Sequence, residues 1–135
     1  MQDKFEMTVP GKPEYICAVR MAVGAIADST GFDVEEAEDI KAAVGEACRL
    51  ISCHVLEGFA SLYTVKCTVE KGRIDITVTK SGNEYIAKGD KRCLNCPEEG
   101  EIGKFMISTL MDEVRIDCSS DDSRTIEMVK KAKQA

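Results

Sequence analysis

The spacing of apolar residues changes at about Ser61, and this change limits the folds open to the chain. Before Ser61, apolar residues recur at intervals of three or four, as they do on one buried face of a helix. Two such stripes are present: Ile16, Val19, Val23 and Ile26, followed by Ile40, Val44, Ala47, Ile51 and Val55. After Ser61, apolar and polar residues mostly alternate, which is typical of strands that bury one face. The chain therefore combines two consecutive helices with a set of strands.

Turn and capping residues give the expected ends of these two helices. Pro13 suits the first turn of a helix, where its missing N–H costs nothing, and Gly31 closes that helix. Asp33 followed by Glu36 is a variant of the capping box, so we expect the second helix to begin there and to end at Gly58.

The strand-like segments and one further helix complete the predicted order of elements. Lys71 and Gly72 separate two β-rich runs and indicate a hairpin. The expected strands are Phe5–Val9, Leu62–Glu70, Arg73–Thr79, Val114–Cys118 and Arg124–Val129, and a short helix is expected around Phe105, Ile107, Leu110 and Met111. This order predicts an α+β two-layer sandwich, with helices on one face of a mixed, mostly antiparallel sheet.

The length of 135 residues predicts one domain over residues 1–135. The segment from Ser81 to Gly100 contains three glycines, one proline and many charges. A structureless stretch of that length is uncommon inside a compact domain and is often functional, so we expect a lid-like loop at about residues 81–103.

The charge balance excludes some classes of partner. The chain has 24 acidic and 18 basic residues, a net charge of −6, whereas a nucleic-acid-binding domain normally shows a basic face. No apolar run approaches the ~20 residues needed to span a bilayer. The first ten residues do not resemble a secretory signal. We therefore expect a soluble cytoplasmic protein that contacts neither nucleic acid nor membrane.

Seven cysteines form the second unusual feature, and without an export signal reduced thiols are expected. Five of them lie in apolar patterns and are expected to act as small hydrophobic residues: Cys17, Cys48, Cys53, Cys67 and Cys118. Cys93 and Cys96 form a CxxC pair in a polar stretch. A single pair supplies two ligands, whereas a structural zinc site needs four, so no metal site is expected. A thiol or metal sensor at Cys93 and Cys96 stays open as an alternative.

Two stretches, EDIKAAVGEAC at 38–48 and GKFMISTLMDEV at 103–114, carry a family resemblance. Together they resemble the bacterial anti-sigma factor kinases of the GHKL ATPase (Bergerat fold) superfamily. The segments at 9–15 and 125–130 are similar to the same family, so the resemblance covers essentially the whole chain. It implies a serine kinase that uses ATP and Mg²⁺, and partners that are a sigma factor and an anti-anti-sigma protein of the STAS type. It also implies a homodimer formed through the first helix and first strand, with Arg20 at a position that some members use for partner contact.

Some of the residues that the resemblance assigns to the nucleotide site are retained. Glu46 stands where the family has its catalytic acid, although an ion-paired surface carboxylate is an alternative role. Gly82 matches the glycine that follows the family's adenine-binding Asp. Gly103 matches a glycine of the turn before the short helix, where backbone N–H groups meet phosphates. Thr125 stands where the family often contacts a phosphate or the adenine.

Three other positions depart from the family pattern. Leu50 replaces the Asn that binds Mg²⁺, and Lys80 replaces the Asp that accepts a hydrogen bond from the adenine amino group. Glu101 replaces the first glycine of the Gly-x-Gly turn and would repel a phosphate. Each lost partner costs ~1–3 kcal/mol, so the three changes together weaken binding by ~4 kcal/mol, about a thousandfold.

These departures predict a degenerate site, and no ATP or Mg²⁺ cofactor is expected. The resemblance then implies a regulator of the anti-sigma type that acts by protein–protein binding as a pseudoenzyme. The alternative is an active ATP-dependent serine kinase that phosphorylates the STAS partner.

Overall fold

A computed structural model describes residues 2–51, 62–81, 96–117 and 124–133. Three helices and five strands lie in these ranges. Their bounds in chain order are β1 (Asp3–Pro10), α1 (Pro13–Asp28), α2 (Val34–Ile51), β2 (Leu62–Glu70), β3 (Arg73–Ser81), α3 (Cys96–Leu110), β4 (Glu113–Asp117) and β5 (Arg124–Lys131).

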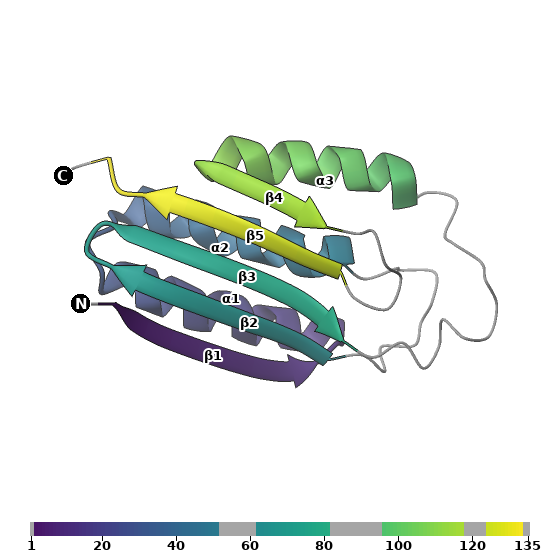
Figure 1. The fold of residues 1–135 in the computed structure, drawn as a ribbon, viewed down its shortest axis with the longest axis horizontal. Coiled ribbons are helices and arrows are strands. Elements are labelled where there is room, and N and C mark those ends of the chain that lie inside the picture. Colours follow the sequence, from purple (N-terminus) through teal and green to yellow (C-terminus); the bar gives the residue numbers. More distant parts are fainter. Residues whose placement is uncertain (1, 52–61, 82–95, 118–123, 134–135) are drawn as a thin grey trace.

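The five strands form one sheet in the order β1-β2-β3-β5-β4. Every neighbouring pair among them is antiparallel. Helices α1 and α2 lie behind the sheet, and α3 packs against α2 and lies beside β4 (Figure 1). The α+β sandwich expected from the sequence is confirmed, and its described strands are antiparallel throughout rather than mixed.

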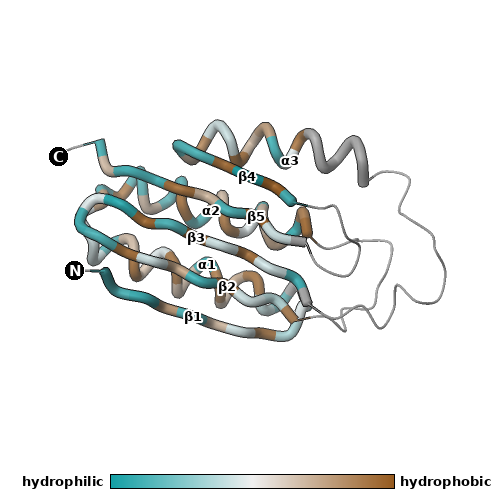
Figure 2. Tube along the Cα trace, in the orientation of Figure 1, coloured by the Kyte–Doolittle hydropathy of each residue, from teal (hydrophilic) through white to brown (hydrophobic). Residues whose placement is uncertain are grey.

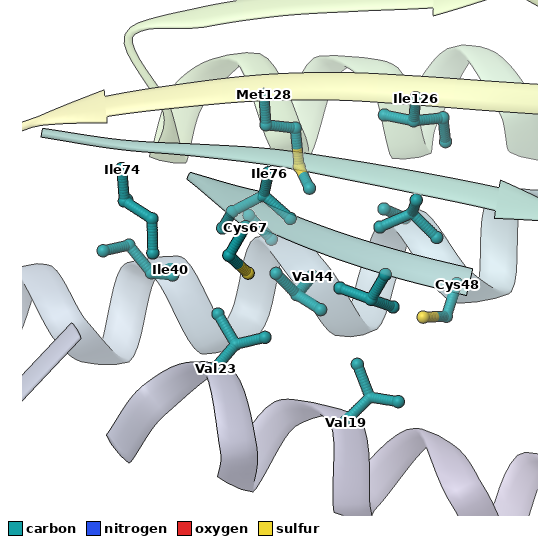
Figure 3. Packing of buried hydrophobic residues seen from close by; sticks show 14 of the residues in the cluster. Val19, Val23, Ile40, Val44, Cys48, Cys67, Ile74, Ile76, Ile126 and Met128 are labelled. Carbon is teal, nitrogen blue, oxygen red and sulfur yellow. The ribbon is translucent and has the colours of Figure 1, made fainter. Parts of the chain in front are cut away.

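The core lies between the sheet and helices α1 and α2. Along the helices and strands, apolar residues recur at the spacing that buries one face (Figure 2). Side chains from both layers meet there, including Val19, Val23, Ile40, Val44, Ile74, Ile76, Ile126 and Met128 (Figure 3). Each fully buried Val or Ile stabilises the fold by about 1.5–3 kcal/mol relative to an exposed one.

Two glycines let α1 and α2 approach closely. A Cβ at Gly24 would lie 2.7 Å from Lys41 Cγ, and a Cβ at Gly45 would lie 2.8 Å from Arg20 Cδ. The stems of Lys41 and Arg20 therefore pack directly over the backbone of the opposite helix, which is a common way for long cationic side chains to cover apolar surface.

The predicted capping box at the start of α2 is confirmed. The Glu36 backbone N–H donates to Asp33 Oδ1 at 2.7 Å, and the Asp33 N–H donates to Glu36 Oε1 at 3.0 Å. The other oxygen of Glu36 accepts the backbone N–H of Lys133 at 2.8 Å. Glu36 is only 3% exposed, so this carboxylate joins the start of α2 to the segment after β5 in a buried setting.

The turn between β2 and β3 uses Gly72, as the sequence indicated. Gly72 has a φ of 76°, which glycine adopts without the penalty that a side chain brings. Its N–H donates to the Thr30 carbonyl at 3.3 Å, and its carbonyl accepts the Ala132 N–H at 2.8 Å. Three chain segments are thus joined at this one residue.

Helix α3 begins earlier than its apolar spacing predicted. It starts at Cys96 rather than near Phe105, so the last part of the expected lid, residues 96–103, is helical. Residues 82–95 of that lid lie outside the described residues. At its other end, Lys130 Nζ donates to the Leu110 carbonyl at 2.6 Å and lies 3.7 Å from Asp39 Oδ2. A cation placed there satisfies a free carbonyl at the end of the helix.

Two of the five cysteines expected in the core are seen there. Burial raises the pKa of the Cys48 thiol to about 12 and that of Cys67 to about 11. Both lie among core side chains in Figure 3, as small hydrophobic residues do. Cys17 is exposed on α1, so the prediction was wrong for that residue, while Cys53 and Cys118 lie outside the described residues.

Candidate functional site

The last turns of α2 face the first half of α3, at the end of the sheet where β3 ends (Figure 1). Three of the residues singled out in the sequence meet there: Glu46 and Leu50 from α2, and Gly103 from α3. Glu46 and Leu50 are one helical turn apart, so they project from the same side of α2. The structure therefore brings together three residues that the resemblance assigned to one site.

Gly103 is buried where α3 approaches α2. A Cβ added to it would lie 3.0 Å from Leu50 Cδ1 and 3.7 Å from Leu50 Cδ2. The two methyl groups of Leu50 therefore lie against the α3 backbone, in the space that the missing side chain leaves. Gly103 lies within α3 and not in a turn before it, which corrects the role expected from the sequence.

Glu46 is held between two neighbours. Its side chain is 17% exposed, and Oε2 accepts a hydrogen bond from Arg49 Nη1 at 3.3 Å. The other oxygen, Oε1, would be 3.5 Å from a Cβ at Gly103. Arg49 was not singled out in the sequence, although its spacing of three residues from Glu46 is one that places side chains together on a helix.

Lys80 lies near the end of β3 and is 7% exposed. It continues the alternation of Ile76 and Val78, so it lies on the side of the sheet that the helices cover. Its cross-strand neighbours are Tyr63 on β2 and Arg124 on β5. A cation therefore occupies the helix-facing side of the sheet at the position where the resemblance places a carboxylate.

Thr125 does not join this cluster. Ile126 and Met128 are buried against the helices, so the alternation of β5 turns Thr125 to the opposite face of the sheet. There it pairs with Thr79, which pairs with Thr64. Thr125 therefore lies away from Glu46, Leu50 and Gly103, and its expected contact with a phosphate or the adenine stays a prediction.

The remaining candidates are only partly placed. Gly82 and Cys93 lie outside the described residues. Glu101 and Cys96 belong to the first half of α3, and only their backbone is described. Within the described ranges, no group of three or more His, Cys, Asp or Glu side chains is arranged to hold a metal ion. None of the helices in those ranges is long and apolar enough to cross a membrane.

The donor set at this site differs from one that would hold Mg²⁺ and adenine. Mg²⁺ prefers oxygen ligands, and the Leu50 side chain carries no lone pair. A lysine ammonium donates hydrogen bonds but accepts none, so Lys80 offers no acceptor for an amino group. The side chains of Leu50 and Lys80 therefore do not fit the Mg²⁺ ion and the adenine of the nucleotide that the resemblance implies.

The family follows from comparison with known proteins. Residues 9–130 match the histidine kinase-like ATPase domain, which spans nearly all of the fold described above. The chain belongs to the histidine kinase-like ATPase domain family.

Within that family, the chain is similar to proteins named serine-protein kinase RsbW. It is 30% identical to the one from Bacillus cereus and 30% identical to the one from Bacillus mycoides. In both cases the match covers 95% of this chain and 84% of the relative.

A solved structure agrees on the fold. The RsbU and RsbW domains of Rv1364c from Mycobacterium tuberculosis match with a TM-score of 0.68 and 16% identity. The match covers 96% of this chain, which spans 32% of that longer one.

Proposed function

We propose that this chain is a regulator of the anti-sigma type that acts by protein–protein binding, with nucleotide binding and kinase activity weakened or lost. Its family and its relatives named RsbW support the regulatory class. The observation that carries the loss of nucleotide binding is the contact of Leu50 with the backbone at Gly103. Apolar atoms there take the place of a metal ligand beside the helix backbone.

The size of the loss follows from the chemistry of two positions. An absent hydrogen-bond partner at a buried nucleotide edge costs about 1–3 kcal/mol, and Lys80 replaces an acceptor with a donor. Leu50 removes one oxygen ligand from the metal. Two such changes weaken binding by about 2–6 kcal/mol, which is a factor between about 30 and 10⁴.

The partners that we propose are a sigma factor and an anti-anti-sigma protein of the STAS type, bound in the cytoplasm by a homodimer of this chain. Arg20 supports a contact role, because it is exposed while its Cδ lies over Gly45. A stem fixed in this way loses less side-chain entropy when a carboxylate pairs with the guanidinium.

Titration of the purified chain with ATP and Mg²⁺, followed by calorimetry, tests the proposal. We expect no micromolar binding by the natural sequence. We expect measurable binding by the variant L50N/K80D/E101G, in which the three departing positions carry the family residues. The matched control Met21→Asn changes an exposed apolar residue on α1 and should leave binding unchanged.

A transfer assay with [γ-³²P]ATP and a STAS protein separates this proposal from the kinase alternative. Glu46, which lies beside Gly103, is the residue that such an activity would need. Micromolar nucleotide affinity or phosphate transfer by the natural sequence would overturn the proposal. The sensor alternative at Cys93 and Cys96 stays a prediction, which metal analysis and thiol counting under oxidation can test.

A further inference from the structure

The first half of α3 contains residues that favour a helix only weakly. Gly100 and Gly103 both lie within it, and glycine is the least favourable residue inside a helix apart from proline. Short helices are marginal in water by themselves, and most of their stability in a protein comes from tertiary packing. The contacts of α3 with the rest of the fold therefore decide whether this half stays helical.

The second half of α3 is held by buried groups. Ile107 is fully buried, and Met111, just after the helix, is 5% exposed. The Leu110 carbonyl, at the end of α3, accepts a hydrogen bond from Lys130 Nζ at 2.6 Å. Apolar burial and a cation thus fix this end of the helix to the core and to β5.

The first half has a different attachment. Every residue from 102 to 106 is exposed except Gly103, which is buried. Because Gly103 has no side chain, the contact comes from α2. Leu50 Cδ1 and Cδ2 lie 3.0 and 3.7 Å from the place that a Cβ of Gly103 would take, and Leu50 also packs against the core. Among the described side chains, Leu50 therefore supplies the apolar contact that joins residues 102–106 to α2.

We propose that Leu50 is a positioning residue that holds the first half of α3 on α2 without any bound ligand. Its methyl groups contact the helix backbone at Gly103, and that contact requires neither a metal ion nor a phosphate. The chain then presents the same α3 surface to a partner with and without ATP. This inference rests on the proposed function in taking nucleotide binding to be weakened or lost.

A consequence for regulation follows from this role of Leu50. A ligand shifts a conformational equilibrium only as far as its affinities for the two states differ. When α3 is already held in the ligand-free chain, a nucleotide has little left to shift. Binding of a partner then depends on the amounts and the competition of proteins, and not on the ratio of ATP to ADP.

Hydrogen exchange of the full chain, followed by mass spectrometry, tests this role without any nucleotide. The amides of residues 100–106 in α3 are compared with those of residues 74–78 in β3. We expect Leu50→Ala to speed exchange in α3 at least about tenfold relative to β3, because local opening of a helix is governed by its own contacts. The matched control Ile102→Ala changes a side chain of the same half that is 61% exposed, and it should leave this ratio unaltered.

A second variant tests the contact itself. In the natural chain, Gly103→Ala places a Cβ 3.0 Å from Leu50 Cδ1, so crowding offsets the better helix propensity of alanine. In the Leu50→Ala background the same space is free. There, Gly103→Ala should slow exchange of residues 100–106 at least about threefold, whereas in the natural chain it should not slow it. The difference between the two backgrounds measures the coupling of the two residues.

Three results would overturn this role of Leu50. They are an unchanged exchange ratio in Leu50→Ala, an equal effect of Gly103→Ala in both backgrounds, and slower exchange of residues 100–106 when millimolar ATP and Mg²⁺ are added to the natural chain. Micromolar ATP binding in calorimetry, with exchange in α3 unchanged, would instead refute the proposed function and support the role of Leu50. The two proposals therefore fail by different measurements.

Discussion

The buried carboxylate of Glu36 is expected to contribute more to stability than other acids of α2. Its two oxygens accept the backbone N–H groups of Asp33 at 3.0 Å and Lys133 at 2.8 Å. Glu36→Ala leaves both N–H groups without that acceptor. Hydrogen bonds to a charged group contribute about 1.5–3 kcal/mol each, so the two together give about 3 kcal/mol once partial rehydration is allowed for.

Urea unfolding followed by circular dichroism measures this effect. A chain of this size has an m-value of about 2 kcal/mol/M, so a loss of about 3 kcal/mol lowers the unfolding midpoint by about 1.5 M. Glu36→Gln keeps one acceptor oxygen and should lower the midpoint by about half as much. Glu35→Ala is the matched control, because Glu35 is exposed in the same turn and should change stability by under about 0.5 kcal/mol.

The reasoning is refuted if Glu36→Ala and Glu35→Ala unfold at the same urea concentration. That result would mean that the N–H groups of Asp33 and Lys133 gain as much from water as from the buried carboxylate.

Two further predictions concern the turn at Gly72 and the buried thiols. Gly72→Ala should destabilise the fold by about 1–2 kcal/mol in urea unfolding, because a φ of 76° is unfavourable for an L side chain although a Cβ there meets only the Ala132 Cβ at 3.8 Å. The control Lys71→Ala should change the urea midpoint of unfolding little. An unaltered midpoint for Gly72→Ala would show that a side chain is not unfavourable at this φ. Thiols of the unfolded chain ionise from about pH 9, whereas Cys48 and Cys67 stay protonated in the folded state up to about pH 12 and 11. The free energy of unfolding should therefore fall as pH rises from 9 to 11, by about 2 kcal/mol for each thiol. Cys48→Ala should make this fall with pH less steep. An equally steep fall in the variant would contradict the raised pKa of the Cys48 thiol.

Local signals were enough to predict much of the fold. The period of three to four gave α1 and α2, and alternation gave the strands, because each element buries one face of its own. Asp33 and Glu36 are close in sequence, so their capping box could be predicted before any tertiary contact was known. The hydrogen bond between Glu36 and Lys133 joins residues that are 97 apart, and no local pattern indicates such a contact.

The candidate site was predicted less completely. The resemblance placed Glu46, Leu50 and Gly103 in one site, and the structure brings them together. The alternation of β5, which the buried Ile126 reveals, turns Thr125 away from these three residues, so its expected nucleotide contact stays a prediction. The early start of α3 was missed because Gly100 and Gly103 weaken the local preference for helix, and packing on α2 overrides that preference.

The hydrogen bonds at Gly72 lie at the end of the sheet away from Leu50 and Gly103 (Figure 1). These bonds join backbone groups of Thr30, Gly72 and Ala132, so they do not depend on the side chains at the other end of the sheet. Substitutions near Leu50 can therefore accumulate during evolution without loosening this corner.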